Sequence, residues 1–516
     1  MKISFFIFLS FLFFSVGKTQ SQYNSEWAGT YSGVGVLQDG ANAIVVNDSG
    51  ETFVTGYIEV PTLNFNYATI KYDKFGNQLW AVTYGNEENS IAFDLAVDDT
   101  GNVYVAGGGP IIKYNRYGSI VWVSERNQGN HKIKLDSLGF IYVAGMKNNI
   151  YITAKYDKNG IRLWNRTYNY QGDARLRDMV IDNWGNIIVT GDSRADSTDY
   201  DYTTIKYTTN GDQVWVRRYN GISMSPTPSD RAYAVDADDM GNIYVTGVSR
   251  AEISGNYCVT IKYDSSGNEI WVKRISEASG GFDIKVDNPN NIYVAGRYGG
   301  SNYTFKMDSS ANILWGSFYI GGSILTSNYP KLLLDSFKNV FVTTNYVVAG
   351  SPHFGFLKYD SLGNQLSLTS YNTQYNGAVE YVNNIAIDKK GNVYLTGESW
   401  ISGTTRYYDF LTVKFKPIMT NIGNEVNLIN DYFLSQNYPN PFNPSTNINF
   451  QISKDGLVRI KIYDVSGREV KILINEFRQA GNYSVVFDGN TFASGVYFYR
   501  LESNKFVETK RMVMIK

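Results

Sequence analysis

The feature that most constrains this fold is a pair of sequence phrases that occurs eight times between residues 44 and 415. The first has the form Gly-Asn-x-Tyr-Val-x-Gly, as in residues 101–107, and the second has the form Ile-Lys-Tyr-Asp-x-x-Gly-Asn-x-x-Trp, as in residues 70–80. The position that opens the first phrase recurs about every 49 residues, which is close to the length of one propeller blade. These positions are Gly50, Gly101, Gly139, Gly185, Gly241, Asn290, Lys338 and Gly391. We therefore expect an all-β chain of repeated four-stranded sheets.

An acid or amide lies three residues before each of these positions, from Asn47 and Asp98 to Asp388. Such a side chain accepts hydrogen bonds from the turn that follows it, and Gly or Asn then tolerates a positive φ. The regular carboxylates therefore predict hairpin turns rather than a row of catalytic groups. Each is alone in its turn, so we predict no metal site.

The two ends of the repeat region fit together. Residues 411–415 are the last copy of the second phrase, and no strand with a tryptophan follows them. Residues 26–31 form a strand with a tryptophan, and no copy of the first phrase precedes it. A lone four-stranded sheet cannot bury its faces, but a closed ring of sheets can. We predict an eight-bladed β-propeller over residues 23–415, in which the N-terminal strand completes the last blade. An open solenoid, the alternative, does not explain why the extra strand matches the missing one.

Composition argues against several functions. The formal net charge is −1 and no basic stretch stands out, so we expect no nucleic-acid partner. Cys258 is the only cysteine and is expected to be a packed strand residue, and the two histidines, His131 and His353, fall in different repeats. No zinc spacing and no Gly-x-Ser-x-Gly motif occurs. We therefore predict no cofactor, no metal and no catalytic residue.

The N-terminus has the pattern of an export signal. Lys2 precedes an apolar run over residues 3–16, which is too short to span a bilayer and matches the apolar region of a signal peptide. We expect residues 1–22 to be that signal peptide, with cleavage between Gly17 and Gln22. No later stretch is apolar enough to cross a membrane, so we expect no transmembrane segment in the mature chain.

A second domain follows the repeats. Residues 416–432 show no periodicity and are interpreted as a linker, whereas residues 433–516 contain short alternating strands such as 458–463 and 496–501. We expect these strands to form a small Ig-like β-sandwich.

Both regions resemble known families. The repeat phrases resemble the SBBP family of bacterial β-propeller repeats over about residues 26–415, a resemblance that implies the fold but no single activity. Residues 437–448, 462–470, 493–501 and 510–516 resemble, in order, the motifs of a type IX secretion C-terminal sorting domain. The residues that carry this resemblance are Pro439, Asn440, Pro441, Phe442, Gly467, Arg468, Gly495, Tyr497, Lys510 and Lys516.

The second resemblance implies a source among the Bacteroidota, passage through the periplasm and recognition by the type IX outer-membrane translocon. The protein would then reach the cell surface or the extracellular medium. The Pro-Asn-Pro-Phe motif and the terminal basic motif have no evident packing role in the sequence, which favours recognition. An ordinary adhesive Ig-like module is the alternative.

The variable loops are the predicted binding region. In each repeat, the turn between strands one and two and the turn between strands three and four are short. The variable insertions therefore gather at the opposite edge of the sheets, which we name the long-loop face. Aromatic residues outside the repeat consensus are candidates for stacking on sugar rings, with packing between loops as the alternative. These are Trp400, Tyr407, Tyr408, Tyr200, Tyr202, Tyr298 and Phe354.

We therefore predict an exported, non-enzymatic protein that binds a glycan or protein partner through its long-loop face. Two alternatives remain open. One is a secreted polysaccharide-active hydrolase or lyase with a carboxylate site in the propeller funnel, since many loop carboxylates could form such a pair. The other is a purely structural envelope protein.

Overall fold

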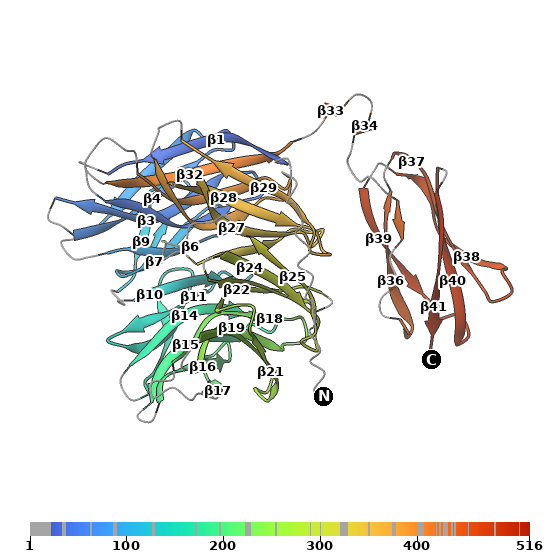
Figure 1. Cartoon of the computed structure of the whole chain (residues 1–516), viewed down its shortest axis with the longest axis horizontal. Helices are drawn as coiled ribbons and strands as arrows, with labels where there is room; N and C mark the ends of the chain where they lie inside the picture. The colour runs from blue at the N-terminus through green and yellow to red at the C-terminus, as the bar shows by residue number, and fades with distance from the viewer. Residues whose placement is uncertain are drawn as a thin grey trace, which may run out of the picture. The chain divides into compact units, whose positions relative to one another are not determined.

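The computed structural model divides the chain into two compact units, Met1–Pro417 and Ile418–Lys516 (Figure 1). It describes residues 22–33, 38–61, 64–85, 90–125, 129–170, 173–195, 198–221, 229–252, 255–288, 290–299, 301–319, 329–348, 351–373, 378–400, 407–418, 421–422, 425–426, 432–434, 437, 440–452, 454–478, 481–504 and 506–515. The expected signal peptide, apart from Gln22, lies outside these residues. Among the described residues, no helix could cross a membrane.

The described part of the first unit contains eight four-stranded antiparallel sheets. The first four consist of β2 (Asp39–Val46), β3 (Thr52–Val60), β4 (Asn64–Tyr72) and β5 (Gln78–Tyr84); β6 (Ala92–Val97), β7 (Val103–Gly107), β8 (Ile112–Tyr114) and β9 (Ile120–Val123); β10 (Asn130–Leu135), β11 (Ile141–Lys147), β12 (Ile150–Tyr156) and β13 (Arg162–Tyr168); and β14 (Ala174–Ile181), β15 (Ile187–Ala195), β16 (Thr198–Tyr207) and β17 (Gln213–Tyr219).

The fifth to eighth sheets follow the same order. They consist of β18 (Asp230–Ala237), β19 (Ile243–Glu252), β20 (Gly255–Tyr263) and β21 (Glu269–Ile275); β22 (Gly280–Val286), β23 (Ile292–Tyr298), β24 (Ser301–Met307) and β25 (Ile313–Tyr319); β26 (Leu332–Leu334), β27 (Val340–Val348), β28 (Ser351–Tyr359) and β29 (Gln365–Tyr371); and β30 (Val379–Ile387), β31 (Val393–Trp400), β32 (Tyr408–Pro417) and β1 (Tyr23–Tyr31). The seventh sheet keeps four strands although its phrases depart most from the repeat.

The eighth sheet combines the two ends of the first unit. Strand β1, blue in Figure 1, pairs with the orange β32, and Trp27 lies opposite Lys414 and Tyr31 opposite Phe410. This is the pairing that the unmatched strands in the sequence predict. The first strands of the sheets contact one another in chain order, and β30 contacts β2.

The turn acids have the structural role that the sequence predicts. Oδ1 of Asp98 accepts hydrogen bonds from the backbone N–H groups of Thr100 and Asn102, at 3.0 and 2.9 Å, and its Oδ2 accepts one from the hydroxyl of Tyr104 at 3.0 Å. The repeated Asp and Tyr therefore hold one hairpin together, which leaves the carboxylate committed to its own turn.

The repeated tryptophans connect each sheet to the next. Nε1 of Trp80 donates a hydrogen bond to the carbonyl of Arg116 at 3.0 Å, and its ring lies against Gly118 in the second sheet. Five further pairs share this contact between an indole and a positive-φ glycine: Trp122–Gly160, Trp164–Gly211, Trp215–Gly267, Trp315–Gly363 and Trp27–Gly76. The last pair joins the eighth sheet to the first.

The second unit contains two larger sheets and one two-stranded sheet in its described part. One orders β35 (Phe433–Leu434), β36 (Ser445–Ile452) and β39 (Gly481–Asp488), and the other orders β38 (Glu469–Arg478), β37 (Gly456–Tyr463), β40 (Gly495–Ser503) and β41 (Phe506–Met514). A two-stranded pair, β33 (Asn421–Ile422) and β34 (Glu425–Val426), precedes them. Ile460, Phe487 and Leu501 are among the fully buried residues of its core.

Candidate functional site

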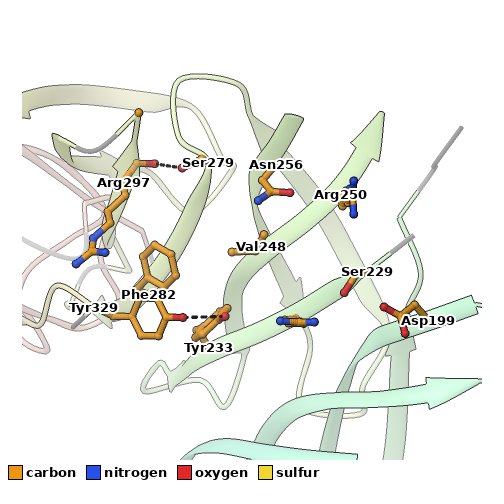
Figure 2. A pocket seen from close by; sticks show the side chains of 12 residues that line it. Asp199, Ser229, Tyr233, Val248, Arg250, Asn256, Ser279, Phe282, Arg297 and Tyr329 are labelled. Carbon is orange, nitrogen blue, oxygen red and sulfur yellow. Dashed lines mark hydrogen bonds between the residues drawn. The ribbon is translucent and has the colours of Figure 1, made fainter. Parts of the chain in front are cut away.

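A hollow of about 590 Å³ opens at the long-loop face of the first unit (Figure 2). It is lined from the starts of β18, β20 and β22 and the ends of β19 and β23. It lies on the long-loop face because these strand ends carry the variable connections. The volume lies within the range of about 300–1,000 Å³ that is usual for ligand sites.

Three arginines give this hollow its charge: Arg231, Arg250 and Arg297. Among the described residues, no carboxylate lies within ion-pair distance of Arg231 or Arg250. The Nε of Arg231 is buried and has no hydrogen-bond partner within the described structure. The Arg231 guanidinium lies 5.2 Å from the centroid of the Tyr200 ring, so a cation–π contact rather than an ion pair holds it.

One wall of the hollow is aromatic. The rings of Phe282 and Tyr329 stack with their centroids 4.3 Å apart at an interplanar angle of 10°, and the ring of Tyr233 meets Tyr329 edge-on at 4.9 Å. The hydroxyls of Tyr233 and Tyr329 share a hydrogen bond of 3.3 Å, drawn in Figure 2. Burial and this hydrogen bond raise the pKa of Tyr233 to about 12. Tyr233 is therefore a neutral donor at physiological pH and a poor general base.

A β-bulge brings Tyr233 and Phe282 to this wall. The register shifts between Ala232 and Ala234 in β18, and between Gly281 and Asp283 in β22. The side chain of the extra residue in a bulge points in a different direction from the one that the regular alternation of its strand would give it. Seven first strands carry such a shift, and in each the extra residue lies five positions before the turn acid.

A smaller hollow of about 290 Å³ is lined by Phe93, Lys132, Arg175 and Arg177, among others. Three cations line it, and each has a carboxylate partner: Arg175 Nε lies 3.7 Å from Asp173, Arg177 Nε lies 3.3 Å from Asp192 and Lys132 Nζ lies 3.5 Å from Asp178. Burial alone would lower the pKa of Lys132, but the Asp178 carboxylate raises it, so Lys132 stays charged.

Cation–π contacts connect the two hollows. The guanidinium of Arg177 lies 5.0 Å from the ring centroid of Tyr233, which lines the larger hollow. Arg175 and Arg231, one from each hollow, lie over the same Tyr200 ring at 4.5 and 5.2 Å. Side-chain contacts through Tyr200 and Tyr233 therefore connect β14 to β18.

The structure brings two of the seven predicted aromatic residues near the larger hollow. Tyr200 is almost fully buried beneath its two arginines, and its hydroxyl donates to Asp173. Tyr298 is 53% exposed and follows Arg297 directly in the chain. Tyr202 and Phe354 are buried, so their side chains face the interior rather than a ligand.

The other three predicted aromatic residues gather in the eighth sheet. Trp400 pairs with Tyr408 between β31 and β32, and the Tyr408 ring lies 6.0 Å from Tyr381. Tyr407 precedes β32, and all three predicted residues are half-buried. Their part in binding stays a prediction.

Four carboxylates, each in the first strand of its sheet, accept hydrogen bonds from the backbone of the next sheet. The acceptors are Asp94, Asp178, Asp236 and Asp283, and the respective backbone donors on the next sheet are Ile133, Val235, Val286 and Leu332. Burial raises the pKa of Asp236, whereas for Asp178 the effect of burial is outweighed by Lys132 and Lys285, which lower its pKa. The four groups are therefore already engaged.

The described residues contain no group of three or more His, Cys, Asp or Glu side chains that could hold a metal ion. Cys258 is buried in β20, as expected, and burial raises the pKa of its thiol to about 12. Such a thiol is inert at neutral pH.

Two of the motif segments in the second unit pack together, which corrects the expectation that they have no packing role. Phe442 is buried and its N–H donates to the carbonyl of Val513 at 3.0 Å, while Oδ1 of Asn440 accepts from the N–H of Val513. The start of the unit is therefore held against its last strand. Pro439 and Lys516 lie outside the described residues.

The middle motif forms an exposed turn. Gly467 has a φ of 81°, and Arg468 Nε lies 3.1 Å from Asp464. Elsewhere, the hydroxyl of Tyr497 donates to the carbonyl of Ala493, and Lys510 forms an ion pair with Glu508. Pro441 and Gly495 lie in the described part of the unit.

Two segments match known family models. Residues 436–516 match the secretion system C-terminal sorting domain, and residues 365–403 match the β-propeller repeat. The second unit is a type IX sorting domain. The protein is therefore exported by that system to the cell surface or the extracellular space, and its sorting domain implies interaction with the translocon.

The chain also has a remote similarity to three individual proteins. An uncharacterized WD repeat-containing protein of Acanthamoeba polyphaga mimivirus is 30% identical over 112 residues, which are 18% of this chain and 8% of that protein. Virginiamycin B lyase of Staphylococcus aureus is 12% identical with a TM-score of 0.39, over 73% of this chain and 95% of that one. PorZ of Porphyromonas gingivalis, a surface component of the type IX secretion system, is 11% identical with a TM-score of 0.33, over 93% of this chain and 74% of that one.

Proposed function

We propose that the first unit is a closed eight-bladed β-propeller that binds a glycan or protein partner outside the cell and catalyses no reaction. Closure is supported by the contact of β30 with β2 and by the pairing of β1 with β32. We further propose that residues 1–22 are a signal peptide and that the source is a member of the Bacteroidota.

The observation that carries the binding proposal is the larger hollow on the long-loop face. It combines a volume of about 590 Å³ with three guanidinium groups and an aromatic wall. Concave sites with a few convergent polar groups and aromatic walls are where ligands usually bind. The sorting domain places this hollow outside the cell, where glycans and surface proteins are the available partners.

The absence of catalysis is supported by the groups near the hollows. Tyr233, with its pKa raised to about 12, is a poor base. The central carboxylates, such as Asp236 and Asp283, accept backbone hydrogen bonds from the next sheet. An acid–base pair for glycoside cleavage would need two carboxyl groups free to reach the substrate.

Binding of the whole chain without residues 1–22 to a glycan array, together with a pull-down from envelope extracts, tests this function. We expect saturable binding that Tyr329→Ala weakens at least tenfold. Tyr117→Ala is the matched control, because Tyr117 is an exposed tyrosine in a short turn away from the hollow. Release of products from a polysaccharide would instead establish the hydrolase or lyase. No binding, with recovery in an envelope complex, would favour the structural protein.

A further inference from the structure

We propose that the ligand of the long-loop face is an acidic saccharide that spans both hollows. Its carboxylate or sulfate groups bind the arginines, and a sugar ring lies against Tyr329. This inference rests on the proposed function of the same face and adds the chemical class of the ligand.

The first argument is charge. The whole chain has 47 basic and 48 acidic residues, so a concentration of cations is a local feature rather than a property of the protein. The larger hollow is lined by three arginines and one acid, Asp199, whose carboxylate lies 3.8 Å from Arg194. An anion in the hollow would therefore meet an excess of positive charge.

The second argument is the lack of carboxylate partners. A neutral ligand offers hydroxyl oxygens, which are weaker acceptors for a guanidinium than a carboxylate or sulfate is. Among the described residues, neither Arg231 nor Arg250 has a carboxylate within ion-pair distance. An anionic ligand would supply that partner, because guanidinium and carboxylate can form two parallel hydrogen bonds.

The third argument is the aromatic wall. The side chain of Tyr329 is 38% exposed and its ring is supported from behind by Phe282, which is 8% exposed. A rigid, half-exposed ring gives a flat apolar surface with a polar edge, which suits the face of a sugar ring bordered by hydroxyl groups. Arg297, whose guanidinium lies 5.7 Å from the Tyr329 ring centroid, would then reach a charged substituent of the same sugar.

The fourth argument is continuity. Arg177 of the smaller hollow lies over Tyr233 of the larger one, and Arg175 and Arg231 share the Tyr200 ring. The side chain of Arg175 is 38% exposed, although its Nε lies 3.7 Å from the Asp173 carboxylate, so a ligand would reach the exposed part of its guanidinium. A ligand with charges repeated along its length can therefore use both hollows at once, which a single charged sugar cannot.

Calorimetry on the full chain without residues 1–22 tests this inference. The probes are hexagalacturonate for carboxylates, a chondroitin sulfate hexasaccharide for sulfates, and maltohexaose as the neutral reference. We expect saturable binding of at least one acidic probe, with at least tenfold loss of affinity between 50 and 300 mM NaCl, because about 10 Å of screening length at 0.1 M weakens exposed ion pairs.

Arg231→Gln combined with Arg250→Gln should weaken the acidic probe at least tenfold. Arg116→Gln combined with Lys74→Gln is the matched control: both are exposed cations in short turns, so their loss removes the same two charges elsewhere. Unchanged thermal unfolding of the variants shows that the fold is intact. Arg175→Gln should weaken the hexasaccharide but leave a disaccharide of the same sugar unaffected, since only the longer ligand reaches the smaller hollow.

The outcomes separate this inference from the function on which it rests. Equal binding of maltohexaose that Tyr329→Ala abolishes and the arginine variants leave unchanged would overturn the acidic ligand but keep the binding function. Capture of a protein through the same hollow without saccharide binding would do the same. Stronger binding of a single-stranded DNA 20-mer would overturn the saccharide class. No ligand of any kind would overturn both.

Discussion

The indole of Trp27 lies against Gly76, and this contact joins the N-terminal strand to the first sheet. A Cβ atom on Gly76 would come within 2.6 Å of Trp27 Cγ. The Trp27 ring also lies 5.5 Å from Tyr72 in the first sheet and 6.2 Å from Tyr394 in the eighth. The same contact between a repeated tryptophan and a glycine occurs between consecutive sheets, so the two chain ends are joined by the interaction that joins the repeats.

Gly76→Ala should destabilise the first unit more than a glycine replacement in an open turn. Gly76 has a φ of 89°, which costs alanine about 1–2 kcal/mol, and the new Cβ would also displace the Trp27 ring. Gly139→Ala is the control, because Gly139 has a φ of 80° but no atom near the position of its Cβ. Urea unfolding measures both. Equal losses would show that the indole contact adds nothing.

Removal of residues 23–31 should promote self-association. The deletion exposes the edge of β32, whose N–H and C=O groups β1 otherwise pairs. An unprotected edge strand is a template for pairing with another chain. Light scattering after size-exclusion chromatography should show dimers or larger species, whereas the full chain serves as the reference. A deleted chain that remains monomeric and equally stable would contradict the role of β1.

Lys206→Met should cost about 3 kcal/mol of unfolding free energy, because it leaves the carboxylate of Asp182 buried without its cation. Lys206 Nζ lies 3.1 Å from Asp182 Oδ2, and the two side chains are 5% and 0% exposed. The control is Lys389→Met, which removes the ion pair with Asp48, where the side chains are 78% and 75% exposed. That change should cost less than about 1 kcal/mol. Similar losses in urea unfolding would refute the assigned role of burial.

Asp39 should make the fold less stable as pH rises from about 4 to about 6. Burial, opposed by hydrogen bonds from the backbone of Gly33 and Glu59, raises the pKa of Asp39 from 3.8 to about 6. Below 3.8 the group is protonated in both states, and above 6 it is ionised in both, so its penalty to the folded state develops between these values.

Asp39→Asn removes this titration, so its stability relative to the natural chain should increase between pH 4 and pH 6.5. Asp264→Asn is the control, because side-chain and backbone hydrogen bonds from Asn268 lower the pKa of Asp264. Its titration therefore lies below this range, and the difference in unfolding free energy between this variant and the natural chain should stay constant with pH. Urea unfolding at pH 4.0, 5.0 and 6.5 measures both variants. A flat difference for Asp39→Asn would contradict the raised pKa.

Much of the fold follows from local rules that a single sequence displays. The Asp98 turn needs only an acid, a positive-φ residue and a tyrosine six positions after the acid, and all three are within one phrase. The pairing of β1 with β32 could be inferred because each strand has a recognisable counterpart in the other repeats.

The hollow could not be predicted by the same reasoning. Tyr202 and Phe354 differ from the repeat consensus, but difference from a consensus says nothing about exposure, and both are buried. Tyr233 and Phe282 lie within first strands, where alternation suggests core residues, and a bulge re-aims them. The sequence signal that could have identified the bulged residues is their position five residues before the turn acid. Phe93 and Arg177 occupy the same position in other sheets.

The pairing of the first described strand with the last strand of its unit also has a consequence in time. On the ribosome, residues 23–31 are made before the other strands of the eight sheets, and their partner, residues 408–417, is made after all of them. The hydrogen bonds between them cannot form until synthesis of the unit is complete. A chain cut short before residue 408 therefore lacks the partner of β1, and its eighth sheet cannot be completed.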